Sequence, residues 1–158
     1  TAAVAGLQFA QAYGQSRALE AQGEYQNTMM RINAAESERQ EKRILELGDK
    51  AAIEHKKKVN QIIGEQRVAY AGGGVDVNFG SAQQVQAETR ELGMKDANEI
   101  RSNAFLEAMG YKSQAQEYRR SGEMALSSSK FAASQTLLTG ALRAGQTAYG
   151  GTGFGGGQ

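Results

Sequence analysis

The single histidine of the chain, His55, is followed directly by Lys56, Lys57 and Lys58. A metal site needs several ligands, and no cluster of carboxylates lies at ligand spacing around this position. A catalytic histidine needs a nucleophile and an orienting acid, and the sequence identifies neither. We therefore expect His55 to be solvated or packed in a helix seam, and we predict no metal ion and no other cofactor.

The densest group of carboxylates lies among basic side chains in the charged stretch 36–43 and just beyond it. Its members are Glu36, Glu38, Glu41 and Glu46. Opposite charges three or four residues apart stabilise a helix by about 0.2–0.5 kcal/mol per pair. We interpret this group as a solvated helix surface in preference to a general acid–base site.

Two glycine-rich stretches have the composition, but not the pattern, of phosphate-binding loops. The first, AGGGVDVNFGS at 71–81, lacks the Lys-Ser/Thr ending of such a loop and the strand–helix setting of a dinucleotide fingerprint. The second, GGTGFGGGQ at 150–158, has no following helix. With no catalytic or phosphate-binding pattern in the chain, we predict that the protein is not an enzyme.

The composition favours long helices over a globular core. The 158 residues include 25 Ala, 16 Gln and 20 Gly, but only 5 Phe, 6 Tyr and no Trp, Pro or Cys. Small side chains bury little apolar area, at roughly 25 cal/mol per Å², and the absence of Pro removes the strongest helix breaker. A lone chain of this kind has a thin core, so we expect stability to come partly from neighbouring copies.

Helix-favouring residues fill two long segments, 15–71 and 81–140, on either side of the glycine-rich loop 72–80. Ser81, with Gln84 three residues later, predicts a capping box at the start of the second segment. In the first segment Tyr25, Met29 and Ile32 share one face, and a second run follows at intervals of three and four residues. That run is Leu45, Gly48, Ala52, His55, Val59, Ile62, Gln66 and Ala69.

The second segment carries a longer run of small residues at the same intervals. Its members are Ala97, Ile100, Ala104, Ala108, Tyr111, Ala115, Tyr118, Gly122, Ala125, Ser129 and Ala132. We predict an all-α fold: a long antiparallel helical hairpin with a Gly-rich connecting loop, assembled into a homo-oligomeric ring or tube. The first six residues of the run are the predicted contacts between copies. The alternative is a compact bundle with arms broken at Gly48, Gly93 or Gly110.

The ends and the loop offer further candidate contacts. The apolar N-terminal segment 1–14 is uncharged and too short to span a bilayer alone, so Val4, Leu7 and Phe9 are candidates for a membrane-proximal surface or a subunit interface. Phe79 either folds back on the helices or docks to a partner. The Gly-rich tail 141–158 holds two spaced aromatics, Tyr149 and Phe154, which either anchor it to a partner or lipid or belong to an unordered end.

Basic residues are few and locally clustered, since the formal net charge is only +1. Lys56, Lys57, Lys58, Arg119 and Arg120 are candidates to face DNA through phosphate contacts, which need no sequence reading. The alternative is an ordinary solvated helix surface.

The run YAGGGVDVNFGSAQQV at 70–85, followed by DANEIRSNAFLEAMGYKSQAQEY at 96–118, resembles the internal virion, or ejection, proteins of short-tailed bacteriophages. Those proteins have an apolar Ala-rich start, a long helix, a glycine break ending in Gly-Ser, and a second helix with an Asn-Ala and Gly-Tyr rhythm. Here Gly80–Ser81, Asn103–Ala104 and Gly110–Tyr111 occupy those places.

The resemblance implies a protein stored inside the virion near the portal and released through the tail at infection. It further implies reassembly in the host cell envelope, most specifically the outer membrane, as part of a channel for genome translocation. The implied partners are other copies, other ejection, portal or tail proteins, the host outer membrane, and double-stranded DNA passing without sequence specificity. The alternatives are a structural virion core, portal-associated or tail protein with no membrane role, and a helical nucleic-acid-binding protein.

Overall fold

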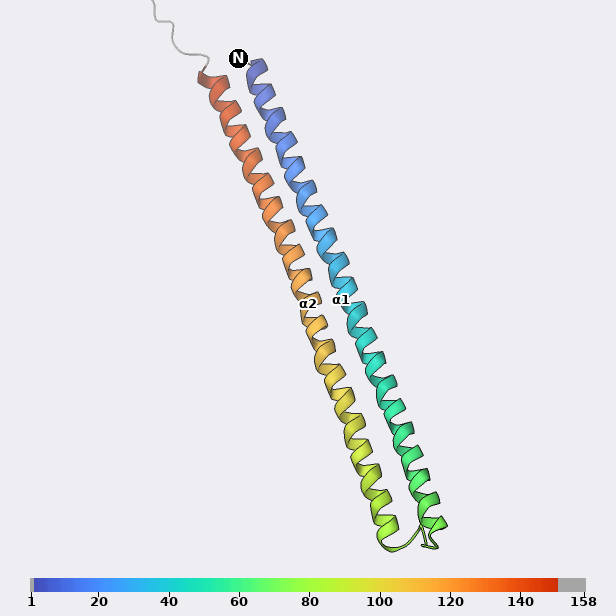
Figure 1. Cartoon of the computed structure of the whole chain (residues 1–158). Helices are drawn as coiled ribbons and strands as arrows, with labels where there is room; N and C mark the ends of the chain where they lie inside the picture. Colours follow the sequence, from blue (N-terminus) through green and yellow to red (C-terminus); the bar gives the residue numbers. More distant parts are fainter. Residues whose placement is uncertain (1, 151–158) are drawn as a thin grey trace, which may run out of the picture. The chain divides into compact units, whose positions relative to one another are not determined.

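A computed structural model describes residues 2–150, with side chains from Ala3 to Thr147. It contains two α-helices, α1 (Ala2–Gly72) and α2 (Gly80–Gly150), which pack against each other and are joined by a short loop (Figure 1). The predicted all-α hairpin is confirmed. Its assembly into a ring or tube stays a prediction.

The helices are longer than the sequence predicted. The apolar segment 1–14 continues into α1 without a break from Ala2, and the first ten residues of the predicted tail, 141–150, belong to α2. Helix α1 also continues through Gly48, and α2 continues through Gly93 and Gly110. The helix breaks that the alternative compact bundle required at these glycines are not present. Phe154 lies outside the described residues, as does the side chain of Tyr149.

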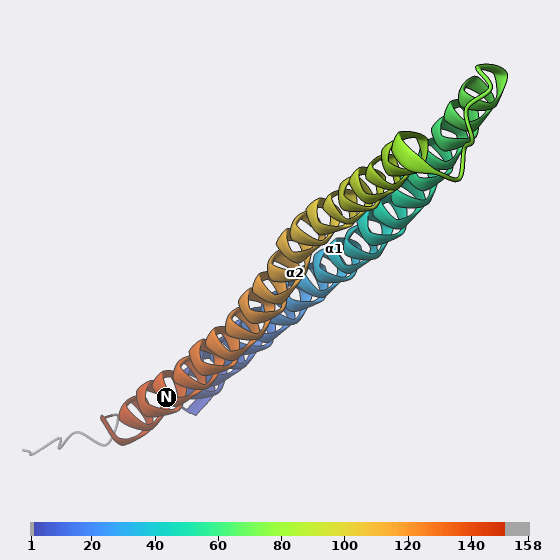
Figure 2. The same cartoon turned by 90° about the horizontal axis from the view of Figure 1, so that it is seen from below.

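The chain divides into two compact units of equal length, each built from one stretch of both helices. Unit 1 comprises residues 1–35 and 115–158, and unit 2 comprises residues 36–114, including the loop. In both units the α1 and α2 ribbons lie side by side, as two perpendicular views show (Figure 2).

An inner seam of buried and half-buried residues runs along α1 at intervals of three and four. Its members are Ala5, Gln8, Ala12, Ser16, Leu19, Gly23, Asn27, Met30, Ala34, Ser37, Glu41, Ile44, Gly48, Ala52, His55, Val59, Ile63, Gln66 and Tyr70. The intervals average close to the 3.6 residues per turn of an undistorted α-helix. The seam therefore keeps to one side of the helix within each unit.

The inner seam of α2 follows the same spacing. Its members are Ala82, Gln86, Thr89, Gly93, Ala97, Ile100, Ala104, Ala108, Tyr111, Ala115, Tyr118, Gly122, Leu126, Ser129, Ala133, Thr136, Gly140, Ala144 and Thr147. Nine of the eleven positions that the sequence predicted between Ala97 and Ala132 belong to this seam, whereas Ala125 and Ala132 are half-buried next to the seam residues Leu126 and Ala133. The prediction of a small-residue packing face on this helix is confirmed.

The predicted seam of α1 was wrong at several places. Ile44, Ile63 and Tyr70 occupy it in place of the neighbouring Leu45, Ile62 and Ala69, which are exposed. The sequence prediction used a period near 3.5, whereas the helix keeps about 3.6 residues per turn, and adjacent apolar pairs hid the shift. The face of Tyr25, Met29 and Ile32 is also exposed, because Gly23, Asn27 and Met30 take the inner positions.

Glycines allow the two helices to approach closely. A Cβ atom at Gly48 would collide with the Cβ of Ala104, and one at Gly140 would collide with the Cβ of Ala12. Gly23 faces Ser129 in the same way. In these contacts, and in that between Gly93 and Val59, the two residue numbers add to 152. The antiparallel register is therefore the same in both units.

The core between the helices is thin. Among the described residues, eight of the ten buried hydrophobic side chains are alanine, and only Val59 and Ile63 are larger. Ser37 lies at the seam and its hydroxyl donates a hydrogen bond to Oε1 of Gln114 at 3.4 Å. The two helices are thus held by many small contacts in place of a few large ones.

The loop is shaped by Gly74, which has a φ of +74°. The amide of Val75 donates to the carbonyl of Tyr70 at 3.0 Å, and the amide of Gly74 donates to that of Ala71 at 3.0 Å. This pair of bonds is a Schellman motif, in which the left-handed residue is almost always glycine. It closes α1 and leaves Phe79 exposed at the tip, not folded back on the helices.

The predicted capping box at the start of α2 does not form. The helix already begins at Gly80, which has a φ of +63°, so Ser81 lies inside the first turn. The Gln84 side chain donates to Glu88 at 3.3 Å instead of reaching back. Gln86 takes over the connection to the loop: its Nε2 donates to the carbonyl of Val77 at 2.9 Å, and its Oε1 accepts from Arg67.

Candidate assembly and membrane-facing surfaces

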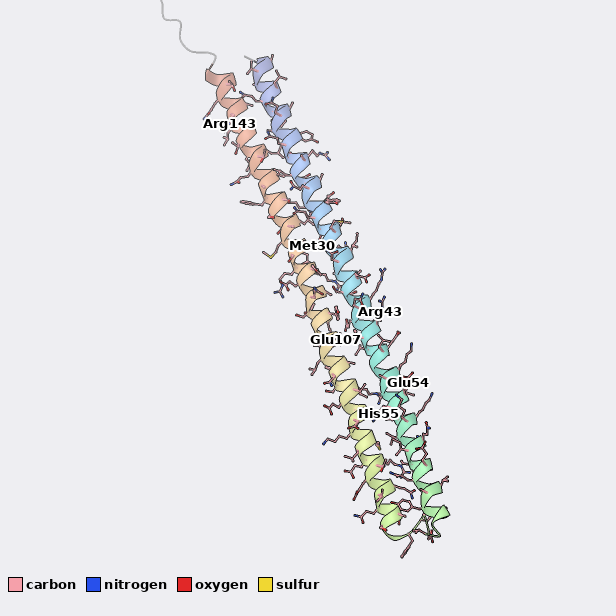
Figure 3. The ribbon with its side chains drawn as sticks, in the orientation of Figure 1. Met30, Arg43, Glu54, His55, Glu107 and Arg143 are labelled. Carbon is pink, nitrogen blue, oxygen red and sulfur yellow. The ribbon has the colours of Figure 1, made fainter. Side chains whose placement is uncertain are left out.

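His55 lies in the inner seam of unit 2 and is 30% exposed at its side chain. Figure 3 labels His55 on α1. Its Nε2 is 3.5 Å from Oδ2 of Asp96 on α2, an ion-pair distance without hydrogen-bond geometry. This fits the packed histidine expected from the sequence. Within the described part of the chain, no three His, Asp or Glu side chains come together as metal ligands.

The charged stretch of α1 forms local helix pairs. Arg39 lies 3.4 Å from Oε2 of Glu36, and the Gln40 amide donates to Oε1 of Glu36 at 3.1 Å. Both partners of the ion pair are more than half exposed, so the pair contributes at most about 1 kcal/mol. These two contacts are typical of a solvated helix surface, whereas Glu41 of the same stretch is half-buried in the inner seam.

The six residues predicted as contacts between copies, Ala97, Ile100, Ala104, Ala108, Tyr111 and Ala115, all lie in the inner seam of α2. Ala97 is fully buried, and Ala108 and Ala115 are each 2% exposed within a single chain. A side chain already covered by α1 has no surface left for a second copy in this conformation. For these three residues the prediction is corrected: they pack within the hairpin. Ile100, Ala104 and Tyr111 are half-buried in the same seam.

The five candidate DNA-facing residues belong to different units. Lys56, Lys57 and Lys58 are consecutive on α1 of unit 2, so their side chains leave the helix about 100° apart and point in three directions. Arg119 and Arg120 are consecutive on α2 of unit 1. Because the side chains within each group point in different directions, we interpret both groups as ordinary solvated helix surfaces.

One end of unit 1 is almost free of charge. Residues 2–16 of α1 hold no charged side chain, and residues 131–150 of α2 hold only Arg143. Val4, Leu7 and Phe9 lie here and are 50%, 65% and 47% exposed. Apolar side chains of α2, above all Leu138 and Leu142, are also exposed at this end. The three residues predicted as membrane-proximal are thus free to contact something outside the chain.

This uncharged end also has a polar side. A groove of about 440 Å³ lies between the helices and is lined mainly by amide and hydroxyl side chains: Gln8, Gln11, Ala12, Gln15, Gln135, Thr136, Thr139, Gly140 and Arg143. The Thr147 hydroxyl donates to Oε1 of Gln8 at 3.1 Å, which ties the two helices together there. The end is therefore amphipathic without ionic groups.

Tyr13 and Arg17 mark the border of the uncharged end on α1. Nε and Nη2 of Arg17 donate to the Tyr13 hydroxyl at 3.1 and 2.9 Å, and the guanidinium lies 5.4 Å from the ring centroid. The hydrogen bond to Tyr13 raises the pKa of Arg17 above its ordinary value. Aromatic and basic side chains together are typical of the boundary between apolar and aqueous surroundings. Over the described residues, neither helix has a stretch long and apolar enough to cross a membrane.

Sequence reasoning missed the outward-facing apolar residues of unit 1 as a group. On α2 these are Met124, Phe131, Leu138 and Leu142, all more than 60% exposed. Their spacing of seven, seven and four residues was a signal that could have found them. It was hidden because small residues on the inner seam share the same helix and are more numerous.

Comparisons with known proteins found no relative of this chain. No protein-family model, curated protein or solved structure matches the chain.

Proposed function

We propose that this protein is an ejection protein of a short-tailed bacteriophage. It is carried inside the virion near the portal, leaves at infection, and oligomerises in the host cell envelope, at the outer membrane, as part of a channel for the genome. The resemblance at 70–85 and 96–118 supports the class of protein. The observation that carries the role is the amphipathic, nearly uncharged end of unit 1.

The length of that end suits the proposed surroundings. Fifteen to twenty helical residues extend about 22–30 Å, and the hydrocarbon layer of a bilayer is about 30 Å thick. No single helix has to cross the layer alone, because in a ring the Gln-rich groove of each copy can turn towards water while Phe9 meets lipid. Uncharged amide groups would also bind a passing polyanion weakly.

The thin core supports the storage and release steps. A protein that leaves through a narrow tail must lose and regain its tertiary structure. This chain has no Pro isomerisation or disulfide step to slow refolding. Its large apolar side chains are mostly exposed in one copy, so association supplies stability that the single hairpin lacks.

Vesicle flotation tests the membrane role. The assembled full-length protein is mixed with vesicles of outer-membrane phospholipid and lipopolysaccharide and centrifuged through a density gradient. Phe9→Glu, which puts a charge at the uncharged end, is expected to reduce the floating fraction at least tenfold. Ile53→Glu is the matched control, because Ile53 is also 47% exposed but lies in charged unit 2. It is expected to float like the unaltered protein.

The same experiment separates the main alternative. If the assembled protein does not float at all, a structural virion core, portal-associated or tail protein without a membrane role is favoured. The nucleic-acid-binding alternative predicts affinity for DNA that falls steeply with salt and depends on Lys56–Lys58. An affinity unchanged when all three lysines are replaced by Gln would eliminate that surface.

A further inference from the structure

Unit 1 has an outer face on each helix, turned away from the inner seam. Each outer position lies two residues beyond a seam position, which is about 200° around the helix. The outer face of α1 consists of Leu7, Ala10, Gly14, Ala18, Ala21, Tyr25, Met29 and Ile32. The outer face of α2 consists of Met124, Ser128, Phe131, Leu138, Leu142 and Gln146. All fourteen residues are exposed.

Neither outer face contains a charged residue, although unit 1 as a whole contains ten. On solvated helix surfaces charged residues are common, as α1 shows in unit 2, where residues 36–58 carry charge on every side. Removal of charge from two faces of the same unit, over about six to seven turns of each helix, is typical of surfaces that pack against another helix.

Two glycines on or beside these faces have no packing reason within one chain. A Cβ at Gly14 or at Gly145 would meet nothing within 4 Å, whereas Gly23, Gly122 and Gly140 of the same unit each face a close neighbour on the other helix. Glycine disfavours a helix relative to alanine. A close approach from outside the chain would explain both positions.

The two faces are complementary in size at matching levels. Within unit 1, residues at the same level have numbers that add to 152, as Ala12–Gly140 and Gly23–Ser129 show. By this rule Leu138 lies at the level of Gly14, and Leu142 lies at the level of Ala10. Phe131 lies at the level of Ala21, and Leu7 lies at the level of Gly145. These four large side chains therefore stand level with small residues on the other helix.

We propose that the outer face of α1 of one copy packs against the outer face of α2 of a second copy, antiparallel and at the same level. Leu7 of one copy then enters the shallow apolar groove of its neighbour, which is lined by Leu138, Ala141, Leu142, Gly145 and Gln146. Each copy offers both faces, so the contact can repeat from copy to copy, and the copies form a ring where the rotation between neighbours closes. The inference rests on the self-association in the proposed function and not on its membrane role.

Cysteine cross-linking tests the level and the pairing, and the chain has no cysteine of its own. The full-length variant Gly14→Cys/Leu138→Cys is assembled, checked by light scattering, oxidised, and run on a non-reducing gel. We expect a ladder of dimers and higher multiples. The two cysteines of one chain lie on opposite sides of unit 1 and cannot pair with each other.

The matched control is Gly14→Cys/Phe131→Cys, in which the second cysteine is seven residues, or about 10 Å, off level. Since a disulfide needs Cα atoms within about 7 Å, this variant is expected to give no ladder. Each single cysteine variant is also expected to stay uncross-linked. Dimers from Gly14→Cys alone, dimers from Leu138→Cys alone, no ladder from the level-matched pair, or a chain that is monomeric at every concentration would each overturn the proposal.

A size exchange guards against variants that fail for other reasons. Gly14→Leu fills the position required by Leu138 of the neighbour and is expected to lower the association constant at least tenfold while the helical circular dichroism is kept, because nothing in the chain contacts Gly14. Gly14→Leu/Leu138→Gly restores the fit and is expected to recover association. Failure to recover overturns the size match. Vesicle flotation that survives a failed cross-link would overturn this interface and leave the proposed function standing.

Discussion

Units 1 and 2 share one way of packing and differ in what they show to the outside. Each has seventy-nine residues and the same small-residue seam in the same register. Yet unit 1 carries ten charged residues and unit 2 carries twenty-five. The inner seam therefore determines how the two helices pack against each other, whereas the outward residues determine which surroundings each unit can contact.

The charge difference also separates two kinds of stability. In unit 2, exposed pairs such as Asp49 with Arg101, whose Nε lies 2.9 Å from the carboxylate, stay in water and add little. In unit 1 the exposed apolar side chains have no such partner within the chain and gain stability only when something covers them. Unit 2 exposes large apolar side chains as well, such as Phe105 and Leu106, but among many charged residues. We therefore expect unit 1 to depend more than unit 2 on what surrounds it.

The largest effect is expected from filling the seam. Gly48→Leu in unit 2 and Gly140→Leu in unit 1 each force a side chain into an alanine of the other helix. We expect each to lower the free energy of unfolding by about 2–3 kcal/mol, measured by urea titration with circular dichroism at low protein concentration. Gly64→Leu, where nothing lies within 4 Å, is the control and should not destabilise. A loss in one unit only would break the claim that the two seams are equivalent.

A slightly smaller effect should distinguish two adjacent isoleucines of unit 2. Ile63 is 5% exposed and Ile62 is 46% exposed. We expect Ile63→Ala to lower the free energy of unfolding by about 2 kcal/mol and Ile62→Ala to change it by less than about 0.5 kcal/mol. Equal losses of unfolding free energy from the two substitutions would contradict the register in which Ile63, and not Ile62, faces α2.

A charge placed outside should separate the units by association. Phe131→Lys in unit 1 is expected to lower the association constant about tenfold, or about 1.4 kcal/mol, because the ammonium would be desolvated at the outer face. Phe105→Lys is the counterpart in unit 2, where the side chain is 54% exposed among charged residues, and association should be unchanged. Sedimentation velocity over a concentration series measures both, and the reverse order would contradict the assignment of the surfaces.

The smallest effect is expected at the surface ion pair of unit 2. Arg101→Ala removes the contact with Asp49. The Arg101 side chain is 43% exposed and the Asp49 side chain is 64% exposed. The free energy of unfolding should fall by about 0.5 kcal/mol or less at low salt, and the difference should vanish in 1 M NaCl, where the screening length is about 3 Å. A difference that persists in high salt would indicate that Arg101 packs as well as pairs.

The sequence was sufficient for the elements and for most of one inner seam. Long runs of helix formers without proline predict two helices, and the predicted small residues from Ala97 to Gly122 all lie in the seam of α2. It was insufficient on α1, where the pairs Ile44–Leu45 and Ile62–Ile63 offer two registers of equal hydrophobicity. Choosing between them requires the partner helix, because an error of one residue turns a side chain by about 100°.

By itself, the sequence determined that this protein is a helical hairpin closed by a glycine-rich loop, because helix propensity and glycine's access to positive φ are local properties. Only the tertiary structure decided that Ala97, Ala108 and Ala115 face the chain's own first helix and that the larger apolar side chains of unit 1 face outward. The reason is geometric: two glycine-lined helices approach so closely that alanine fills the space between them, and larger side chains are left on the outside.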